Sequence, residues 1–154
     1  MKHILFVCTG NTCRSAMAEA LFKKILKDNS IEGVNVSSTG VAVFTPSPAS
    51  GQAISVMKEK GIDLTSHQSK QVTQEMIEQA DYIFTMTASH RESLLRECPI
   101  AADKAFTLKE FTTENDEDVY DPFGFSKAAY ATCAKEIGIC LEQLLYKLKK
   151  ELSS

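Results

Sequence analysis

The N-terminal segment is the part of the sequence that most constrains the fold. Four apolar residues, 4–7 (ILFV), are followed at once by the small and polar residues 8–15 (CTGNTCRS). Apolar side chains then recur every four positions at Met17, Leu21 and Ile25, with lysines between them on the other side. The continuous apolar run predicts a strand buried on both faces, and the four-residue spacing predicts an amphipathic helix. We therefore expect the chain to begin with strand, loop and helix.

The rest of the chain repeats this alternation. Strands are expected at 34–38, 81–86 and 104–107, and helices at 49–60 (ended by Gly61), 73–80 and 89–98. An acidic loop, 114–120, precedes a long C-terminal helix marked by Ile137, Leu141, Leu144, Leu148 and Leu152. Alternating strands and helices predict an α/β fold in which helices cover both faces of a parallel sheet. Because one domain takes about 100–200 residues, residues 1–154 are expected to form one.

Composition excludes several classes of protein. A net charge of −3 is unlike the basic footprint of a nucleic-acid-binding protein. No apolar run approaches the roughly 18 residues of a membrane span, and the N-terminus lacks the longer apolar region of a secretory signal. The 5 cysteines are scattered and odd in number, so we expect reduced thiols and a cytoplasmic location. We expect no nucleic acid and no membrane as partners.

The loop after the first strand has the composition of an anion-binding site. It contains Gly10 and Asn11, two residue types that tolerate a positive φ, so its N–H groups can turn inward around an anion. The following helix adds its N-terminal dipole, and the Arg14 guanidinium matches two phosphoryl oxygens. Cys8, at the end of the strand, is placed to face the phosphorus atom. The pattern indicates a phosphate-binding loop with a cysteine nucleophile.

The same loop offers means of activating a thiol. Helix N-termini and nearby cations favour the thiolate form of cysteine, and the Ser15 hydroxyl is close enough in sequence to donate to sulfur. Ser15 is also a candidate cap of the helix. Taken alone, Cys8 is more often a buried apolar side chain and Arg14 a surface cation. Their combination at a strand–helix junction favours the functional interpretation.

Several motifs resemble the low-molecular-weight protein phosphatase family. They are V-C-T-G-N-T-C-R-S at the N-terminus, S-S-T-G around Ser38, H-Q-S-K-Q-V-T from His67, D-Y-I-F-T-M at 81–86, and D-P-F-G at 121–124. The resemblance covers essentially the whole chain. One departure is Ala16, where the family usually has proline in the first helical turn; alanine also fits a helix there.

The resemblance implies a fold, a reaction and a set of site residues. The fold is a three-layer α/β/α arrangement with a central four-stranded parallel sheet in the order 2-1-3-4. The reaction is hydrolysis of a phosphorylated protein side chain through a phosphocysteine. Cys8 is the nucleophile, and Asp121, stiffened by Pro122, is the acid and then the base. An Asp-Pro pair without this resemblance is simply a turn starter. The phosphoryl oxygens are bound by Thr9, Gly10, Asn11, Thr12, Cys13 and Arg14, and the loop is supported by Asn11, Ser15, Ser38 and His67.

The substrate is indicated by the residue at position 12. Tyrosine phosphatases of the family have a bulky aliphatic residue there, whereas the protein-arginine-phosphatase branch has threonine, as in this chain. The resemblance therefore favours phosphoarginine, with phosphotyrosine as the alternative, and assigns specificity to Thr12, Phe44 and Phe123. The acidic residues Glu114, Asp116, Glu117 and Asp118 either favour a cationic leaving group or form a solvated loop.

Two other functions are compatible with parts of the pattern. Arsenate reductases share the loop and fold, but they need a close pair of additional cysteines in mid-chain, where only Cys98 occurs. A phosphocarrier with a cysteine after its first strand conflicts with Arg14 and Asp121, which promote hydrolysis.

The remaining expectations concern ligands and the other cysteines and histidines. Phosphate or other oxyanions are expected as ligands or inhibitors, and the protein is expected to be a monomer without cofactor. No metal site is expected, because among His and Cys pairs only Cys8 and Cys13 have ligand spacing. These two flank the loop and are expected to form a disulfide on oxidation. Cys133 and Cys140 are interpreted as core residues, and His3 and His90 as structural histidines.

Overall fold

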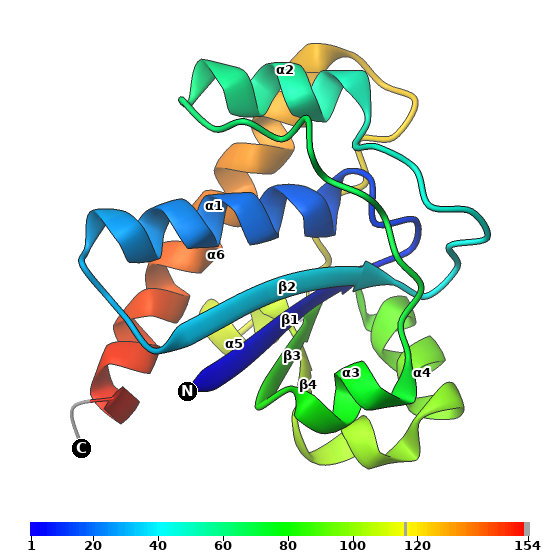
Figure 1. Ribbon diagram of the computed structural model, residues 1–154, viewed down its shortest axis with the longest axis vertical. Coiled ribbons are helices and arrows are strands. Elements are labelled where there is room, and N and C mark those ends of the chain that lie inside the picture. The colour runs from blue at the N-terminus through cyan, green and yellow to red at the C-terminus, as the bar shows by residue number, and fades with distance from the viewer. Residues whose placement is uncertain (116, 153–154) are drawn as a thin grey trace.

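The computed structural model describes residues 1–115 and 117–152. Its sheet contains β1 (Lys2–Cys8), β2 (Val34–Gly40), β3 (Tyr82–Thr85) and β4 (Ala105–Thr107). All neighbouring strands are parallel, in the order β2-β1-β3-β4 (Figure 1). The α/β fold and the predicted 2-1-3-4 order are confirmed. Because β1 occupies an inner position, its carboxyl end lies beside those of β2 and β3.

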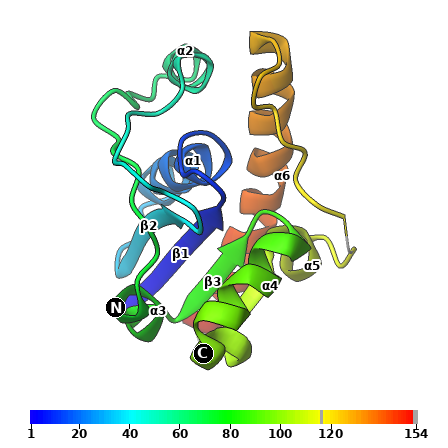
Figure 2. The same ribbon diagram turned by 90° about the vertical axis from the view of Figure 1, so that its right-hand side faces the viewer.

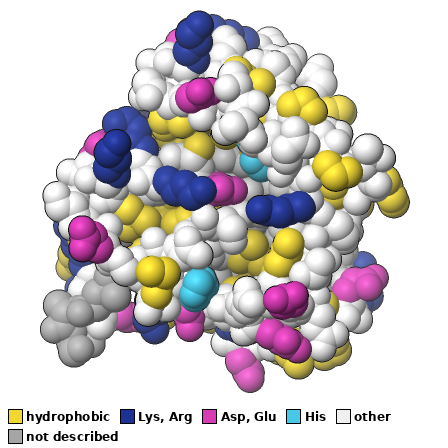
Figure 3. All heavy atoms as spheres, in the orientation of Figure 1, with side chains coloured by type: hydrophobic (Ala, Val, Ile, Leu, Met, Phe, Trp, Pro, Cys, Tyr) yellow, Lys and Arg dark blue, Asp and Glu magenta, His cyan; other side chains and the backbone are white. Residues whose placement is uncertain are grey.

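Helices lie on both faces of the sheet and complete three layers (Figure 2). One face carries α1 (Arg14–Asp28), α2 (Gly51–Glu59), α5 (Leu108–Thr112) and α6 (Lys127–Leu152), which share one hydrophobic core. The other face carries α3 (Gln74–Gln79), α4 (Ala88–Glu97) and a 3-10 helix (Pro99–Asp103), which share a second core. On the face of the molecule that carries α1, basic and acidic side chains are interspersed (Figure 3).

Strand β1 is buried on both sides, as its apolar run predicted. Phe6 and Cys8 face the core under α1 and α6, whereas Leu5 and Val7 face the core under α3 and α4. This alternation is the two-residue period of a strand. The Phe6 ring packs edge-on against Phe22 of α1, with ring centroids 6.1 Å apart. These contacts fix the carboxyl end of β1, where Cys8 is 1% exposed.

The helix boundaries differ from prediction at three places. The prediction that Ser15 caps α1 is wrong: Cys13 is the N-cap residue, it makes no side-chain cap, and the Ser15 hydroxyl contacts Cys8 instead. The short helix α5 was not predicted, although Thr107 and Glu110 form a complete capping box at its start. The 3-10 helix after Cys98 was also not predicted.

The predicted end of α2 and the predicted core cysteines are confirmed. Gly61 follows α2 with a φ of +76°, the left-handed conformation that commonly ends a helix. Cys133 and Cys140 are buried in the core, as predicted. Asp116 and the side chain of Leu152 lie outside the described residues. No helix in the described part of the chain is both long and apolar enough to cross a bilayer.

Candidate active site

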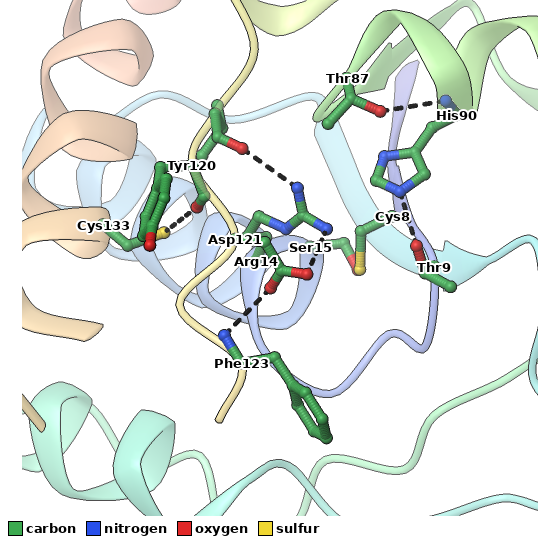
Figure 4. A network of polar contacts seen from close by, with 11 residues as sticks. Cys8, Thr9, Arg14, Ser15, Thr87, His90, Tyr120, Asp121, Phe123 and Cys133 are labelled. Atoms are coloured by element: carbon green, nitrogen blue, oxygen red, sulfur yellow. Dashed lines mark hydrogen bonds and ion pairs between the residues drawn. The ribbon is translucent and has the colours of Figure 1, made fainter. Parts of the chain in front are cut away.

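The phosphate-binding loop, residues 8–14, connects β1 to α1 at the carboxyl edge of the sheet. Cys8 is the last residue of β1 and Arg14 is the first residue of α1. A cavity of about 230 Å³ lies over the loop and is lined by Cys8, Thr9, Gly10, Thr12, Cys13, Arg14, Asp121 and Phe123. The structure thus brings the predicted nucleophile, the predicted cation and the predicted acid to one cavity (Figure 4).

Asn11 is the residue on which the supporting contacts converge. Its φ is 56°, a left-handed conformation that asparagine tolerates better than most residues. Its side-chain amide donates to Ser15 Oγ over 2.8 Å and to Ser38 Oγ over 2.9 Å. Its Oδ1 accepts from the backbone N–H of Lys70 at 3.1 Å, and its carbonyl oxygen accepts from His67 Nε2 at 2.6 Å. The predicted supporting residues Ser15, Ser38 and His67 therefore all contact Asn11.

Gly40, at the end of β2, allows the loop to lie close to the sheet. A Cβ atom added at Gly40 would lie 2.4 Å from the carbonyl oxygen of Thr9. Immediately after it, the backbone N–H of Val41 donates to the carbonyl oxygen of Cys8 over 3.0 Å. Any side chain at position 40 would displace the loop. This requirement was not predicted, although Gly40 closes the S-S-T-G motif.

The Cys8 sulfur has a hydroxyl partner inside the protein. Ser15 Oγ lies 2.8 Å from Cys8 Sγ, and Ser15 is fully buried. Asn11 donates to the same oxygen, so the hydroxyl hydrogen of Ser15 remains for another acceptor. The carbonyl of Thr39 is a more distant acceptor, at 3.4 Å. When Cys8 is a thiolate it has no hydrogen to donate, so Ser15 is the donor across the shorter contact and stabilises the negative sulfur.

Cys13 differs from Cys8 in its surroundings. Burial, together with the nearby Cys8, raises the pKa of the Cys13 thiol to about 11. Cys13 is therefore a protonated thiol at neutral pH. The two loop cysteines are chemically distinct, and only Cys8 has the Ser15 hydroxyl as a partner.

The Arg14 guanidinium is buried and contacts two groups of the segment between α5 and α6. Its Nη1 donates to the carbonyl oxygen of Val119 over 3.0 Å, and its Nη2 lies 3.4 Å from Asp121 Oδ2. Among residues 1–115 and 117–152, its buried Nε has no hydrogen-bond partner. The bond to Val119 fixes the plane of the guanidinium. The Nε and Nη2 edge then forms a two-donor fork that matches two phosphoryl oxygens.

Asp121 reaches the cavity from the segment between α5 and α6. Its side chain is 53% exposed, and its Oδ1 accepts from the backbone N–H of Phe123 at 3.0 Å. Phe123 lines the cavity and is 66% exposed, and its role in specificity stays a prediction. Phe44 is 95% exposed and is not among the residues that line the cavity. Its role in specificity stays a prediction.

His90, which was interpreted from the sequence as structural, contacts the phosphate-binding loop. Its Nε2 lies 2.7 Å from Thr9 Oγ1, so it contacts the residue next to the nucleophile (Figure 4). Burial, reinforced by the charge of Arg14, lowers the pKa of His90 to about 4. In the sequence, the only indication of this contact is the location of His90 shortly after β3, the strand that pairs with β1, because α4 begins there.

The side chains around the cavity suit a thiol nucleophile and an oxyanion as its ligand. Within residues 1–115 and 117–152, no group of three His, Cys, Asp or Glu side chains is arranged to hold a metal ion. A buried sulfur, a two-donor guanidinium and a carboxylate instead surround one small cavity. Such a set suits nucleophilic attack on a phosphoryl group.

Comparison with known proteins identifies the family. The sequence profile of the low molecular weight phosphotyrosine protein phosphatases matches residues 3–154. The chain belongs to this family. It is 43% identical to the protein-arginine-phosphatase of Geobacillus stearothermophilus over 148 residues, which cover 96% of this chain and 97% of that protein. The protein is a cysteine-based phosphatase, as the sequence motifs predicted.

Solved structures of this phosphatase family superimpose closely on the chain. A mutant of YwlE from Bacillus subtilis is 42% identical and has a TM-score of 0.93, covering 97% of this chain and 99% of its own. A variant of the YwlE arginine phosphatase that carries a phosphorylated active-site serine is 43% identical, with a TM-score of 0.92 and 96% coverage of both chains.

Proposed function

We propose that this phosphatase hydrolyses phosphoarginine side chains of proteins through a phosphocysteine at Cys8. The observation that carries the proposal is the composition of the cavity, where Thr12 lies with Cys8, Arg14 and Asp121. The resemblance to the arginine-phosphatase branch at position 12, and the similarity to the Geobacillus protein, support the same substrate.

In the first step the Cys8 thiolate attacks the phosphorus atom. The S–P bond forms as the P–N bond breaks, and the electron pair of that bond moves to the guanidine nitrogen. Asp121, in its protonated form, transfers a proton to this nitrogen, so that arginine leaves as a neutral or cationic guanidine. A leaving group as basic as arginine needs this proton. Arg14 and the loop N–H groups stabilise the charge on the phosphoryl oxygens.

In the second step a water molecule hydrolyses the phosphocysteine. The Asp121 carboxylate accepts a proton from water while the water oxygen attacks phosphorus, and the S–P bond breaks. Phosphate and the Cys8 thiolate are the products, and the Ser15 hydroxyl stabilises the thiolate from 2.8 Å. The phosphorylated serine in the YwlE variant is the corresponding adduct on oxygen in that protein and supports a covalent route.

We assign discrimination between phosphoarginine and phosphotyrosine to two polar side chains that line the cavity, Thr12 and Asp121. The Thr12 hydroxyl provides a hydrogen-bonding group where an aliphatic side chain offers only methyl groups. The exposed Asp121 carboxylate suits a guanidinium, whose nitrogens donate in a planar fork. Two of the nearby acidic residues have structural partners instead: Asp118 Oδ1 accepts from the N–H of Ala88 at 2.9 Å, and Glu117 lies 3.6 Å from Lys109 Nζ. They favour a structural role for the acidic loop.

The alternative functions are less well supported. Phosphotyrosine remains the second candidate substrate, because the matching family is that of phosphotyrosine phosphatases. Arsenate reductases that resemble this chain need a close pair of additional cysteines in mid-chain, and this chain has only Cys98 there. Cys98 lies in the core under α3 and α4, whereas Cys8 faces the opposite core. We further propose that residues 1–154 act as one catalytic domain and as a monomer, in the cytoplasm, where the five unpaired cysteines stay reduced.

A radiolabelled protein substrate tests the proposed function. A protein phosphorylated on arginine with ³²P is incubated with wild type, with Cys8→Ser and with the matched control Cys98→Ser. We expect phosphate release by the wild type and by Cys98→Ser, and none by Cys8→Ser. Acid quenching during wild-type turnover is expected to trap label on the peptide that contains Cys8. Phosphate release by Cys8→Ser within tenfold of wild type overturns the assignment of the nucleophile.

A further inference from the structure

The Thr9 hydroxyl lies at the cavity and is held by a residue from another part of the fold. Thr9 follows the nucleophile directly, is exposed, and lines the cavity. Its Oγ1 lies 2.7 Å from His90 Nε2 (Figure 4). His90 sits in the first turn of α4, which follows β3, the neighbour of β1 in the sheet. The Thr9 side chain, which belongs to the loop, is therefore held by a residue outside the loop.

The protonation of His90 determines the direction of this hydrogen bond. His90 is 6% exposed, and burial and Arg14 keep the pKa of its imidazole at about 4, so the ring is neutral at physiological pH. Its buried Nδ1 has no partner among the described residues. A buried N–H without an acceptor is rare, so the ring hydrogen belongs on Nε2, where an acceptor is present. Nε2–H then donates to Thr9 Oγ1, and the hydroxyl hydrogen of Thr9 is left for the cavity.

We propose that the Thr9 hydroxyl donates a hydrogen bond to a phosphoryl oxygen bound in the cavity, and that His90 is the positioning residue that orients it. The pair adds a side-chain donor to the backbone N–H groups and to Arg14. The inference rests on the proposed function only in one respect, which is that a phosphoryl group binds over the loop.

The first turn of α4 is braced so that His90 keeps its position. Thr87 caps the helix, and its Oγ1 accepts from the backbone N–H of His90 at 3.1 Å. Asp118 Oδ1 accepts from the N–H of Ala88 at 2.9 Å. Asp118 belongs to the segment that also carries Asp121. The start of α4 therefore contacts both the phosphate-binding loop and the segment that bears the acid.

The test compares single and double variants with two probes that need no protein substrate. The variants are Thr9→Val, His90→Phe and their combination, with Thr132→Val, an exposed threonine of α6, as the matched control. The probes are turnover of p-nitrophenyl phosphate and inhibition by orthovanadate. Loss of one hydrogen bond to a charged oxygen costs roughly 10–100-fold. We expect losses of that size in kcat/KM and in vanadate affinity for both single variants.

Coupling between the two positions distinguishes a donor pair from two structural residues. If His90 acts through Thr9, the double variant is no worse than the more impaired single variant. The conservative variants Thr9→Ser and His90→Gln restore a donor at each position and are expected to recover most of the loss. Circular dichroism and thermal unfolding identify a variant that fails to fold. If His90→Phe does not fold, Thr9→Val and His90→Gln still provide the comparison.

Three results overturn the proposal. Activity and vanadate affinity of Thr9→Val within twofold of wild type show that the hydroxyl is not a ligand. Losses that multiply in the double variant show that His90 does not act through Thr9. Failure of His90→Gln to recover the loss of His90→Phe shows that the imidazole serves packing alone. Failure of the enzyme to hydrolyse phosphoarginine, with these two probes behaving as expected, contradicts the proposed substrate and leaves the Thr9–His90 pair standing.

Discussion

Ser15 Oγ lies 2.8 Å from Cys8 Sγ and accepts a hydrogen bond from Asn11 Nδ2 over the same distance. This contact connects the nucleophile to a buried polar network. The same amide of Asn11 donates to Ser38 Oγ, and Ser38 donates to Glu19 Oε1 over 2.5 Å. Because Ser15 Oγ accepts from Asn11, its own hydrogen is available to a thiolate at Cys8. The effect of the network on the reaction is greatest where the thiolate is attacking or leaving.

Replacement of Ser15 by alanine tests this contact. A hydrogen bond to a charged group is worth about 1.5–3 kcal/mol, which corresponds to roughly a 10–100-fold loss in kcat/KM. We expect that loss in steady-state turnover of p-nitrophenyl phosphate. The matched control is Ser66→Ala, an exposed serine outside the cavity, which is expected to behave as wild type. Equal activity of the two variants contradicts a role for Ser15 in stabilising the thiolate.

The role of Asp121 as acid depends on the leaving group. We expect Asp121→Asn to slow hydrolysis of phosphoarginine peptides by roughly 10²–10⁴, the usual contribution of a positioned general acid. The loss is expected to be smaller with p-nitrophenyl phosphate, because its phenolate leaves without a proton. Asp103→Asn, at an exposed carboxylate on the 3-10 helix, is the control. Equal losses on the two substrates would mean that Asp121 positions the segment rather than supplying the proton.

Oxidation is expected to distinguish the two loop cysteines. Because its pKa is raised to about 11, Cys13 is protonated, and peroxide should react first at Cys8. Peroxide oxidises the Cys8 thiolate to a sulfenic acid, and the Cys13 thiol condenses with it as water leaves. Peptide mass spectrometry is expected to show a Cys8–Cys13 disulfide, and dithiothreitol should restore activity.

The Cys13→Ala variant provides the control for this redox prediction. Without the second thiol, the sulfenic acid is exposed to further oxidation, so less activity should return on reduction. The absence of a Cys8–Cys13 link in treated wild type, with equal recovery of wild type and Cys13→Ala, would rule out the disulfide.

His90 is expected to make folding stability depend on pH. Burial and the charge of Arg14 lower its pKa from 6.5 to about 4 on folding, although the facing carboxylates of Asp118 and Asp121 oppose this shift. Above pH 6.5 the ring is neutral in both states and has no effect. As pH falls from 6.5 towards 4, the unfolded state binds the proton and folding loses up to about 3 kcal/mol. Urea unfolding at pH 7.5 and pH 5 should show a smaller decrease for His90→Gln than for wild type. Parallel decreases contradict the buried neutral ring.

The sequence predicts the site best where the site is local. The strand, the phosphate-binding loop and α1 follow from contiguous patterns, because the apolar run, the small polar residues and the four-residue apolar spacing that predict them all lie within residues 4–28. Ser38 and His67 contact Asn11 from 27 and 56 positions away, and only the family resemblance linked them to the loop. Neither side chain has a periodicity or spacing that reveals such a contact.

The unpredicted features depend on close approach between distant segments. Gly40 is needed because the Thr9 carbonyl would lie 2.4 Å from its Cβ, and this contact exists only once β2 pairs with β1. His90 reaches Thr9 across 81 positions because α4 begins beside the carboxyl end of β1. In contrast, α5 has a capping signature in the sequence, at Thr107 and Glu110. Its length of 5 residues is too short to show a helical periodicity, so the helix was not predicted.

Thr12 is expected to set the preference between substrates. Thr12→Ile removes a hydroxyl from the cavity and adds apolar surface suited to an aromatic ring. A pocket change of one or two methyl-sized groups is worth roughly 10–200-fold in discrimination. We expect activity to fall on phosphoarginine and to rise on phosphotyrosine, measured as kcat/KM. Parallel losses on both substrates would mean that Thr12 only supports the loop.

The most direct test of the proposed function is the ratio of kcat/KM for phosphoarginine and phosphotyrosine in one peptide sequence. Placing both modifications at the same position removes differences in peptide binding, so the ratio reports the cavity alone. If Thr12 and Asp121 recognise a guanidinium, the wild-type enzyme favours phosphoarginine by at least about tenfold. A ratio at or below one contradicts the account and assigns the enzyme to phosphotyrosine.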